Sequence, residues 1–192
     1  MFAWHKEDLD LYSINYLHFG KPKCWYGIPS NEDEEFEKLA RTIFPNAYQD
    51  CKEFMRHKTY LINPLIVKNK GITVHKCVQY PGEFVITFGA SYHAGFNMGY
   101  NCAEAVNFAL DRWIPLGKKA GVCKCSKDSV KIDMECFENN VLKPKARSKK
   151  NVEPVVKIRV EEKVEKPVLT RRRKAKKKTG VKRKKKNAVT LL

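Results

Sequence analysis

The chain lacks several patterns that would assign it to a large functional class. It has no glycine-rich phosphate loop and no G-x-S-x-G elbow, the signatures of P-loop nucleotide hydrolases and of α/β-hydrolases. Charged residues follow Met1 within a few positions, and the longest uncharged stretch, 84–103, is interrupted by glycines and polar residues. The sequence therefore predicts neither a signal peptide nor a membrane span.

Acidic residues are scarce in one part of the chain only. Residues 141–192 hold 21 Lys and Arg against 4 Asp and Glu, with no aromatic residue, Cys or His, whereas residues 1–140 hold 17 of each sign. A charged segment without aromatics cannot bury enough apolar surface to offset its ordering entropy. We therefore expect a folded domain over 1–140 and a disordered basic tail over 141–192.

The seven cysteines all lie in the neutral part. An odd number of cysteines in a chain without a visible export signal argues against a disulfide framework. We expect reduced thiols, some of them metal ligands, and an intracellular compartment.

The pattern of apolar residues and turn residues predicts a mainly β domain with peripheral helices. Helices are expected from a cap at Ser30 or Asn31, over Tyr48–Lys58, and over Pro64–Asn69 with Asn63 as cap. The expected strands are 11–19, 23–28, 73–80, 83–88, 91–96 and 103–110. Short strands at this spacing are typical of an antiparallel barrel or sandwich.

One candidate metal site combines His5 and Glu7, an H-x-E pair, with the distant His93. Residues two apart on a strand face the same side, and a second strand of a small barrel can supply the third ligand. Two histidines and one carboxylate on one face form the facial triad of non-haem Fe(II) oxygenases. The spacing alone leaves open that His5 and Glu7 are ordinary surface residues.

A second candidate metal site consists of four soft or borderline ligands: Cys51, His57, Cys123 and Cys125. Such a set suits tetrahedral zinc. The two halves are far apart in sequence, and their spacings are not those of common zinc fingers, so separate buried thiols remain an alternative.

Three further residues lie on the two strands that follow the H-x-E pair: Asn15, Lys23 and Trp25. A lysine ammonium buried on a barrel wall requires an anion, and a small dicarboxylate is one natural partner. The alternative is an edge lysine that faces solvent.

The tail contains two basic clusters around a short spacer, from Arg171 to Lys186. This pattern is typical of a bipartite nuclear-import signal, to be bound by an import receptor, and it also favours non-specific contact with DNA phosphates. Without interleaved aromatic residues, stacking on bases is not predicted. A solvated tail without a receptor is the alternative.

Two segments resemble the Jumonji-C (JmjC) histone lysine demethylases. Residues 2–29 resemble their central strands with the sequence FAWHKEDLDLYSINYLHFGKPKCWYGIP. Residues 82–120 resemble their distal-histidine segment with the sequence GEFVITFGASYHAGFNMGYNCAEAVNFALDRWIPLGKKA. The Cys/His quartet resembles that of the zinc-containing JmjN/JmjC subfamily, which acts on trimethylated lysines nine and thirty-six of histone H3.

This resemblance implies a partial double-stranded β-helix, a cupin-like jelly roll, that binds Fe(II), 2-oxoglutarate and Zn(II). By resemblance, His5, Glu7 and His93 bind the iron, Lys23 and Asn15 bind 2-oxoglutarate, and Phe2 and Trp25 wall its pocket. Cys51, His57, Cys123 and Cys125 then hold a structural zinc. The implied enzyme is a nuclear dioxygenase that hydroxylates N-methyl groups of histone H3 methyl-lysine and releases formaldehyde and succinate.

The chain departs from the family pattern in two respects. On the substrate side, the family's Ser-Thr pair is Ala105-Val106, although Asn107 matches. The chain also opens at the metal-binding strand, without a JmjN segment, the first barrel strands, a co-substrate tyrosine or the tyrosines of the methyl-lysine cage. We therefore expect either a truncated form or a protein completed by another chain. A catalytically silent chromatin protein that uses its tail for DNA binding or nuclear import is the main alternative, and a JmjC hydroxylase of another protein is a third.

Overall fold

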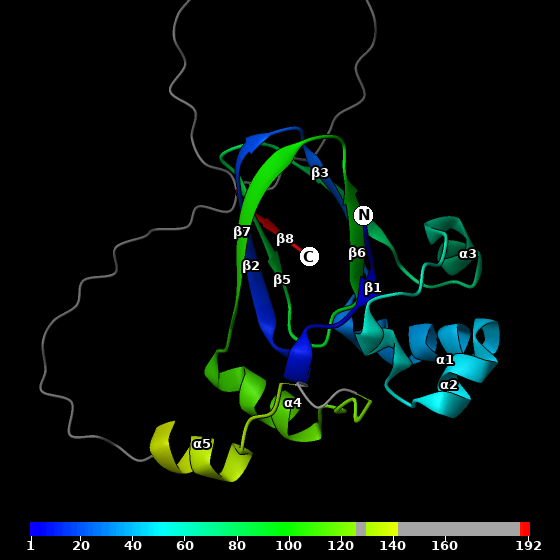
Figure 1. Ribbon diagram of the computed structural model, residues 1–192, viewed down its shortest axis with the longest axis vertical. Coiled ribbons are helices and arrows are strands. Elements are labelled where there is room, and N and C mark those ends of the chain that lie inside the picture. The colour runs from blue at the N-terminus through cyan, green and yellow to red at the C-terminus, as the bar shows by residue number, and fades with distance from the viewer. Residues whose placement is uncertain (126–129, 142–188) are drawn as a thin grey trace, which may run out of the picture.

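The computed structural model describes residues 1–125, 130–141 and 189–192 of the chain. Its strands form two sheets that face each other across an open barrel (Figure 1). The first sheet contains, in spatial order, β1 (Phe2–His5), β6 (His93–Asn97), β3 (Lys23–Gly27) and β4 (His75–Gln79). The second contains β7 (Asn101–Phe108), β2 (Tyr12–Gly20), β5 (Phe84–Thr87) and β8 (Val189–Leu191). This arrangement confirms the predicted mainly β, jelly-roll class.

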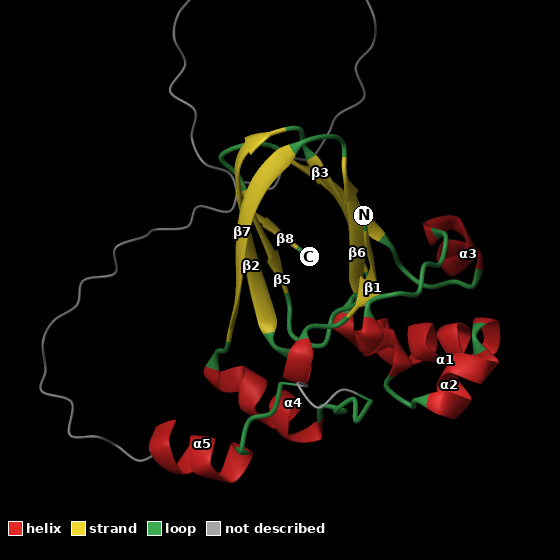
Figure 2. Cartoon of the chain, viewed as in Figure 1, coloured by secondary structure: helices red, strands yellow, loops and turns green. Residues whose placement is uncertain are grey.

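The described residues also contain short helices, which gather at the first sheet and at one end of the barrel (Figure 2). They are α1 (Asp33–Ile43), α2 (Pro45–Asp50), α3 (Pro64–Asn69), α4 (Ile114–Lys119) and α5 (Met134–Val141). None of the helices in this part of the chain has the length and apolar character that crossing a membrane requires.

The main hydrophobic core lies between the outer face of the first sheet and α1. Phe36, Leu39 and Ala40, at the i, i+3, i+4 spacing of one helix face, are buried there. Trp4 of β1 packs against Phe36 with ring centroids 5.2 Å apart, and its Nε1 donates a hydrogen bond to the carbonyl of Ile62 at 2.8 Å. Each large side chain buried in this way contributes about 1.5–3 kcal/mol. The helices therefore cover the outer face and leave the inner face free to form a site.

Most of the expected elements are confirmed, with ends that shift by a few residues. The six expected strands correspond to β2, β3, β4, β5, β6 and β7. The helix α3 begins as predicted, because the Asn63 side chain accepts a hydrogen bond from the backbone N–H of Leu65 at 2.9 Å. It is followed by Gly71, whose φ of 81° is in the left-handed region.

Two helix predictions are wrong in detail. Ser30 and Asn31 do not cap α1, because they lie in a 3₁₀ turn, Ser30–Glu32, that runs directly into the helix. The expected helix over Tyr48–Lys58 is split into α2 and a 3₁₀ turn, Phe54–His57. The break occurs at Cys51, whose extended backbone (φ −147°, ψ 119°) ends the helical hydrogen bonding.

The last helix before the residues that are not described is α5, Met134–Val141, and the expected domain end near residue 140 stays a prediction. The expected disordered tail falls largely on residues 142–188, including the basic clusters, which lie outside the described residues. The expectation is wrong for Val189–Leu191, which form β8 by pairing with β5.

A buried ion pair joins the turn Phe54–His57 to the 3₁₀ turn Asp8–Asp10. The Arg56 guanidinium donates to Asp10 Oδ1 at 2.7 Å, and the two side chains are only 7% and 11% exposed. Arg56 also donates to the backbone carbonyl of Glu7 at 3.0 Å and to the Glu53 carboxylate at 2.9 Å. This one side chain therefore links Glu53 of its own segment to Glu7 and Asp10.

We expect Arg56→Leu to destabilise the domain by about 3–5 kcal/mol, because it leaves the Asp10 carboxylate buried without its partner. Urea denaturation followed by circular dichroism measures the change. The control is Lys38→Leu, which breaks an exposed pair with Glu35 (2.6 Å) and should leave the midpoint unchanged. Equal midpoints for the two variants would show that the Arg56 contacts contribute little.

Candidate functional site

The site is built around β6, which lies between β1 and β3. In the antiparallel register, His93 is opposite His5 on one side and Gly27 on the other, and Gly95 is opposite Phe2 and Trp25. Directly opposite residues project from the same face of a sheet. The pairing of β1 with β6 is irregular between Phe2 and His5, and an inserted residue there lets both side chains lie on the inner face.

His5, Glu7 and His93 converge on the inner face of the first sheet. Their ligand atoms all lie within 4.8 Å of one another, with His93 Nε2 at 3.3 Å and His5 Nε2 at 4.0 Å from Glu7 Oε1. Glu7 lies just beyond the end of β1, in extended backbone (φ −65°, ψ 157°) that keeps it on the face of His5. The structure thus brings together the three residues that the sequence singled out.

Backbone carbonyls orient both imidazole rings. His5 Nδ1 lies 2.7 Å from the carbonyl oxygen of Ala3, and His93 Nδ1 lies 3.2 Å from that of Ser91. A neutral ring that donates its Nδ1–H to a carbonyl carries a lone pair on Nε2. Both Nε2 atoms face Glu7, and a ring with this tautomer can bind a metal ion through Nε2.

The protonation states of the cluster also suit a cation. Burial, followed by the nearby His93, lowers the pKa of His5 to about 4. Burial alone would raise the pKa of Glu7, but the hydrogen bond and charge of His93 outweigh it and lower this pKa to about 2. At neutral pH the cluster therefore presents a neutral His5 and an ionised carboxylate.

Lys23 provides a cationic group on the same face of β3 as Trp25. Its ammonium donates to the amide oxygen of Asn97 at 2.7 Å and lies 5.6 Å from the centre of the Phe2 ring and 5.9 Å from that of Trp25. Burial lowers the pKa of Lys23. Within the described residues its nitrogen forms no ion pair, so a charged group is held between two aromatic rings with a neutral partner.

A buried glutamine connects the walls of the two sheets, and the sequence did not indicate it. Gln79, 1% exposed, accepts a hydrogen bond from Trp25 Nε1 at 2.9 Å and donates to the side-chain oxygen of Asn15 at 3.1 Å. Strand alternation gave no signal for its burial, because Gln79 shares a strand face with the polar Thr73 and His75. Gln79 thereby fixes Asn15 and Trp25 relative to each other.

The second sheet contributes one unsatisfied polar atom. The hydroxyl of Thr87 on β5 is buried and has no hydrogen-bond partner among the described residues. Thr87 is opposite Ser13, and Asn15 is opposite Val85, so these side chains share the inner face of that sheet. The two imidazoles and one carboxylate fit Fe(II), while the Lys23 ammonium and the unpaired hydroxyl fit a small anionic co-substrate.

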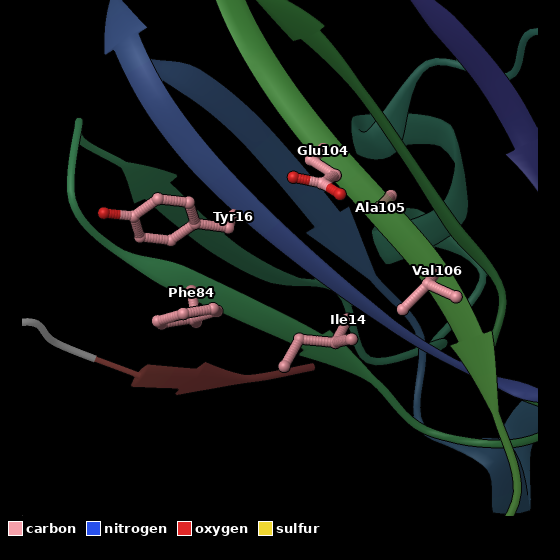
Figure 3. Close-up of a pocket in the computed structure, with 6 residues that line it drawn as sticks. All are labelled: Ile14, Tyr16, Phe84, Glu104, Ala105 and Val106. Carbon is pink, nitrogen blue, oxygen red and sulfur yellow. The ribbon is translucent and has the colours of Figure 1, made fainter.

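The substrate-side residues divide between the two faces of β7. Ala105 is opposite Asn15 and Asn107 is opposite Ser13, whereas Val106 is opposite Ile14. Val106 is 62% exposed and lines a shallow hollow on the outer face of the second sheet (Figure 3). The other residues around this hollow are Ile14, Tyr16, Phe84, Glu104 and Ala105. The inner face therefore receives Asn107, whose side-chain amide donates to the carbonyl of Tyr12 at 3.2 Å, and not Val106.

The second cluster joins the turn after α2 to the segment after α4. Cys51, His57, Cys123 and Cys125 place their ligand atoms within 4.8 Å of one another. The Cys51 and Cys123 sulfurs are 3.8 Å apart, and His57 Nε2 is 3.3 Å from the Cys123 sulfur. Zinc–sulfur bonds of about 2.3 Å at tetrahedral angles place two sulfurs roughly 3.8 Å apart. The cluster therefore has the dimensions of a zinc site.

Comparison with known proteins agrees with this geometry. Residues 1–108 match the family model described as JmjC domain, hydroxylase. The chain is 57% identical over 136 residues to lysine-specific demethylase 4B of Mus musculus, 52% over 136 residues to lysine-specific demethylase 4D of Rattus norvegicus, and 50% over 145 residues to probable lysine-specific demethylase 4F of Homo sapiens.

These alignments cover 71%, 71% and 76% of this chain. They span 12%, 27% and 23% of the respective relatives, so the chain corresponds to a minor part of each of them. The family match includes His5, Glu7 and His93, the residues that converge on the inner face of the barrel. The chain belongs to the JmjC-domain hydroxylase family, with lysine-specific demethylases among its relatives.

Proposed function

We propose that this chain carries the metal-binding part of an Fe(II)- and 2-oxoglutarate-dependent histone lysine demethylase. Its substrate is a trimethylated lysine of the histone H3 tail, and its products include formaldehyde and succinate. The observation that carries the proposal is the convergence of His5, Glu7 and His93 beside the buried Lys23 ammonium. The names of the relatives support the choice of a methylated lysine as substrate.

The roles of the residues follow from their positions. His5, Glu7 and His93 would hold the iron, which, when bound, supplies the oxidising chemistry with dioxygen and 2-oxoglutarate. The Lys23 ammonium pairs with the distal carboxylate of 2-oxoglutarate, and Asn15, oriented by Gln79, donates to the same molecule. Phe2 and Trp25 exclude water from this carboxylate, which strengthens the charge pair.

The first experiment measures demethylation directly. The chain, and a chimera in which the N-terminal portion of lysine-specific demethylase 4B precedes it, are incubated with a trimethyl-lysine histone H3 peptide, Fe(II), 2-oxoglutarate and ascorbate. We expect formaldehyde release and loss of methyl groups in the mass spectrum of the peptide. His93→Ala should abolish both, because it removes one of three ligands.

The matched control is His18→Ala. His18 lies outside the cluster, and its Nε2 is 3.2 Å from the Glu104 carboxylate. This variant should retain activity. Absence of turnover in the iron-loaded chimera would overturn the catalytic proposal and favour a silent chromatin protein.

A second experiment tests the role of Lys23. Lys23→Met should weaken 2-oxoglutarate binding by about 2–5 kcal/mol, which corresponds to roughly 30-fold or more. Titration calorimetry with Mn(II) in place of iron measures this affinity. Lys21→Met, a change of the exposed lysine two positions earlier, is the control and should leave the affinity unchanged. Equal affinities for the two variants would show that a cationic residue other than Lys23 binds the co-substrate.

We further propose that the Cys/His cluster holds a structural zinc. All four ligands come from the protein, as in closed structural sites, and the metal would join segments some 70 residues apart, from Cys51 to Cys123. Zinc sites of this type contribute apparent binding free energies of about 10–16 kcal/mol in finger peptides. Zinc therefore stabilises the attachment of the segment after α4.

Metal analysis and thermal unfolding test this second site. The parent chain should contain one zinc ion, and Cys125→Ser should lose it and unfold at a lower temperature. The control is Cys102→Ser, because Cys102 is also exposed but lies on β7 outside the cluster. Full zinc occupancy in Cys125→Ser would exclude this residue as a ligand.

We infer a nuclear location from the same function, because the proposed substrate is a histone. The basic clusters between Arg171 and Lys186 support this location through their composition. Contact of these clusters with DNA or with an import receptor is likewise proposed from sequence alone, since they lie outside the described residues.

A further inference from the structure

The edge of β5 is occupied by residues from the far end of the sequence. Val189–Leu191 pair with Phe84–Ile86 in parallel register. Beyond them, the Leu192 N–H donates to the carbonyl of Ile86 and the Phe88 N–H donates to the carbonyl of Leu192, both at 2.8 Å. Figure 1 shows β8 beside β5, with the chain end between the two sheets. The segment thus satisfies backbone groups that an edge strand leaves open.

The side chains of this segment alternate as in a strand with one inward face. Val189 and Leu191 are 42% and 53% exposed, whereas Thr190 and Leu192 are partly buried. A period of two is expected when one face of a strand packs against a core. The alternation shows that Leu192 points toward the interior while Leu191 points away.

Leu192 reaches the opposite sheet at Gly27. A Cβ atom placed on Gly27 would lie 3.3 Å from Leu192 Cδ2 and 3.4 Å from Leu192 Cβ. Because Gly27 has no side chain, the leucine packs directly against the backbone of β3. The leucine therefore bridges the two sheets at this level of the barrel.

This level of the barrel is also the level of the candidate iron ligands. Gly27 is opposite His93 in the register of β3 with β6, and His93 is opposite His5. Adjacent strands lie about 4.8 Å apart, so Leu192 packs one strand away from His93 on the inner face. The apolar side chain therefore lies on the inner face at the level of His93.

We propose that Val189–Leu192 is an internal cover of the site. It takes the edge position on β5, and Leu192 fills the interior in front of Gly27. Access to His5, Glu7 and His93 from this side then requires the segment to leave β5. The regulatory part of this inference rests on the proposed function, whereas the position of the segment does not.

Hydrogen exchange of the full chain tests whether the segment occupies β5. In Leu192→Asp, a carboxylate would replace the buried leucine, and we expect amides of Phe84–Phe88 to exchange at least about tenfold faster. Leu191→Asp changes the outward-facing neighbour and should leave exchange unchanged. Identical exchange in the two variants would overturn the proposal, provided that α1 remains protected in both.

A disulfide cross-link tests the placement of Leu192 even if Leu192→Asp unfolds the domain. The Cβ separation at Gly27 and Leu192 is close to the roughly 3.5–4.5 Å of disulfides, so Gly27→Cys combined with Leu192→Cys should oxidise to a disulfide that peptide mass mapping identifies. Gly27→Cys with Leu191→Cys is the control, and the native thiols are the same in both. Equal yields would overturn the placement of Leu192.

Uptake of Mn(II) tests the cover itself. The ion is hard and disfavours the thiolate cluster, and the loss of its free-ion electron paramagnetic resonance signal measures binding. With zinc present, we expect uptake to be about tenfold faster in Leu192→Asp than in Leu191→Asp, because opening precedes binding. Equal rates would overturn the cover. If no variant takes up Mn(II), the proposed iron site and the cover both fail, while the exchange result decides the position of β8.

Discussion

The register of β6 between β1 and β3 is the constraint on which the rest of the site depends. It places His5, His93 and Gly27 at one level and Phe2 and Trp25 beside Gly95 at the next. Because side chains alternate between faces, a slip of one residue would turn His93 toward the helices and leave two ligands without the third. The helices on the outer face stabilise this register. Trp4 points outward and is buried against α1, so the residues next to it on β1 point toward the inner face.

Glu7 depends on a different support, because it lies beyond the end of β1. The turn that follows it contains Leu9 and Asp10 at positive φ, a conformation that non-glycine residues adopt only when tertiary contacts hold them. Arg56 supplies those contacts by binding both the Asp10 carboxylate and the Glu7 carbonyl. Since His57 of the second cluster is its neighbour in the chain, a metal ion in that cluster would also restrict Arg56. Arg56 therefore contacts the backbone of one cluster, at Glu7, and is adjacent in sequence to a residue of the other, His57.

The sequence predicted those features whose signals are local. Alternating strands and the Asn63 cap act through neighbouring residues, and they appear at the expected positions. The grouping of His5 and Glu7 with His93 required the family resemblance as well, because their spacing is common by chance. Gln79, the break at Cys51 and β8 were missed, since each depends on a partner far away in sequence. In particular, nothing in Val189–Leu191 specifies a strand until the edge of β5 is present to bind it.

The interior contains two groups whose burial is costly without a ligand. Among the described residues, the Lys23 ammonium has only a neutral amide as hydrogen-bond partner, and the Thr87 hydroxyl has none. Leu192 is apolar and cannot satisfy either group, so a barrel covered by β8 retains their desolvation cost. The anionic co-substrate proposed above would relieve this cost at Lys23. The closed form leaves these polar groups unsatisfied, whereas the open form lets a ligand satisfy them. The two forms therefore differ in their affinity for the ligand. Such a difference is the condition for the ligand to shift the equilibrium toward opening.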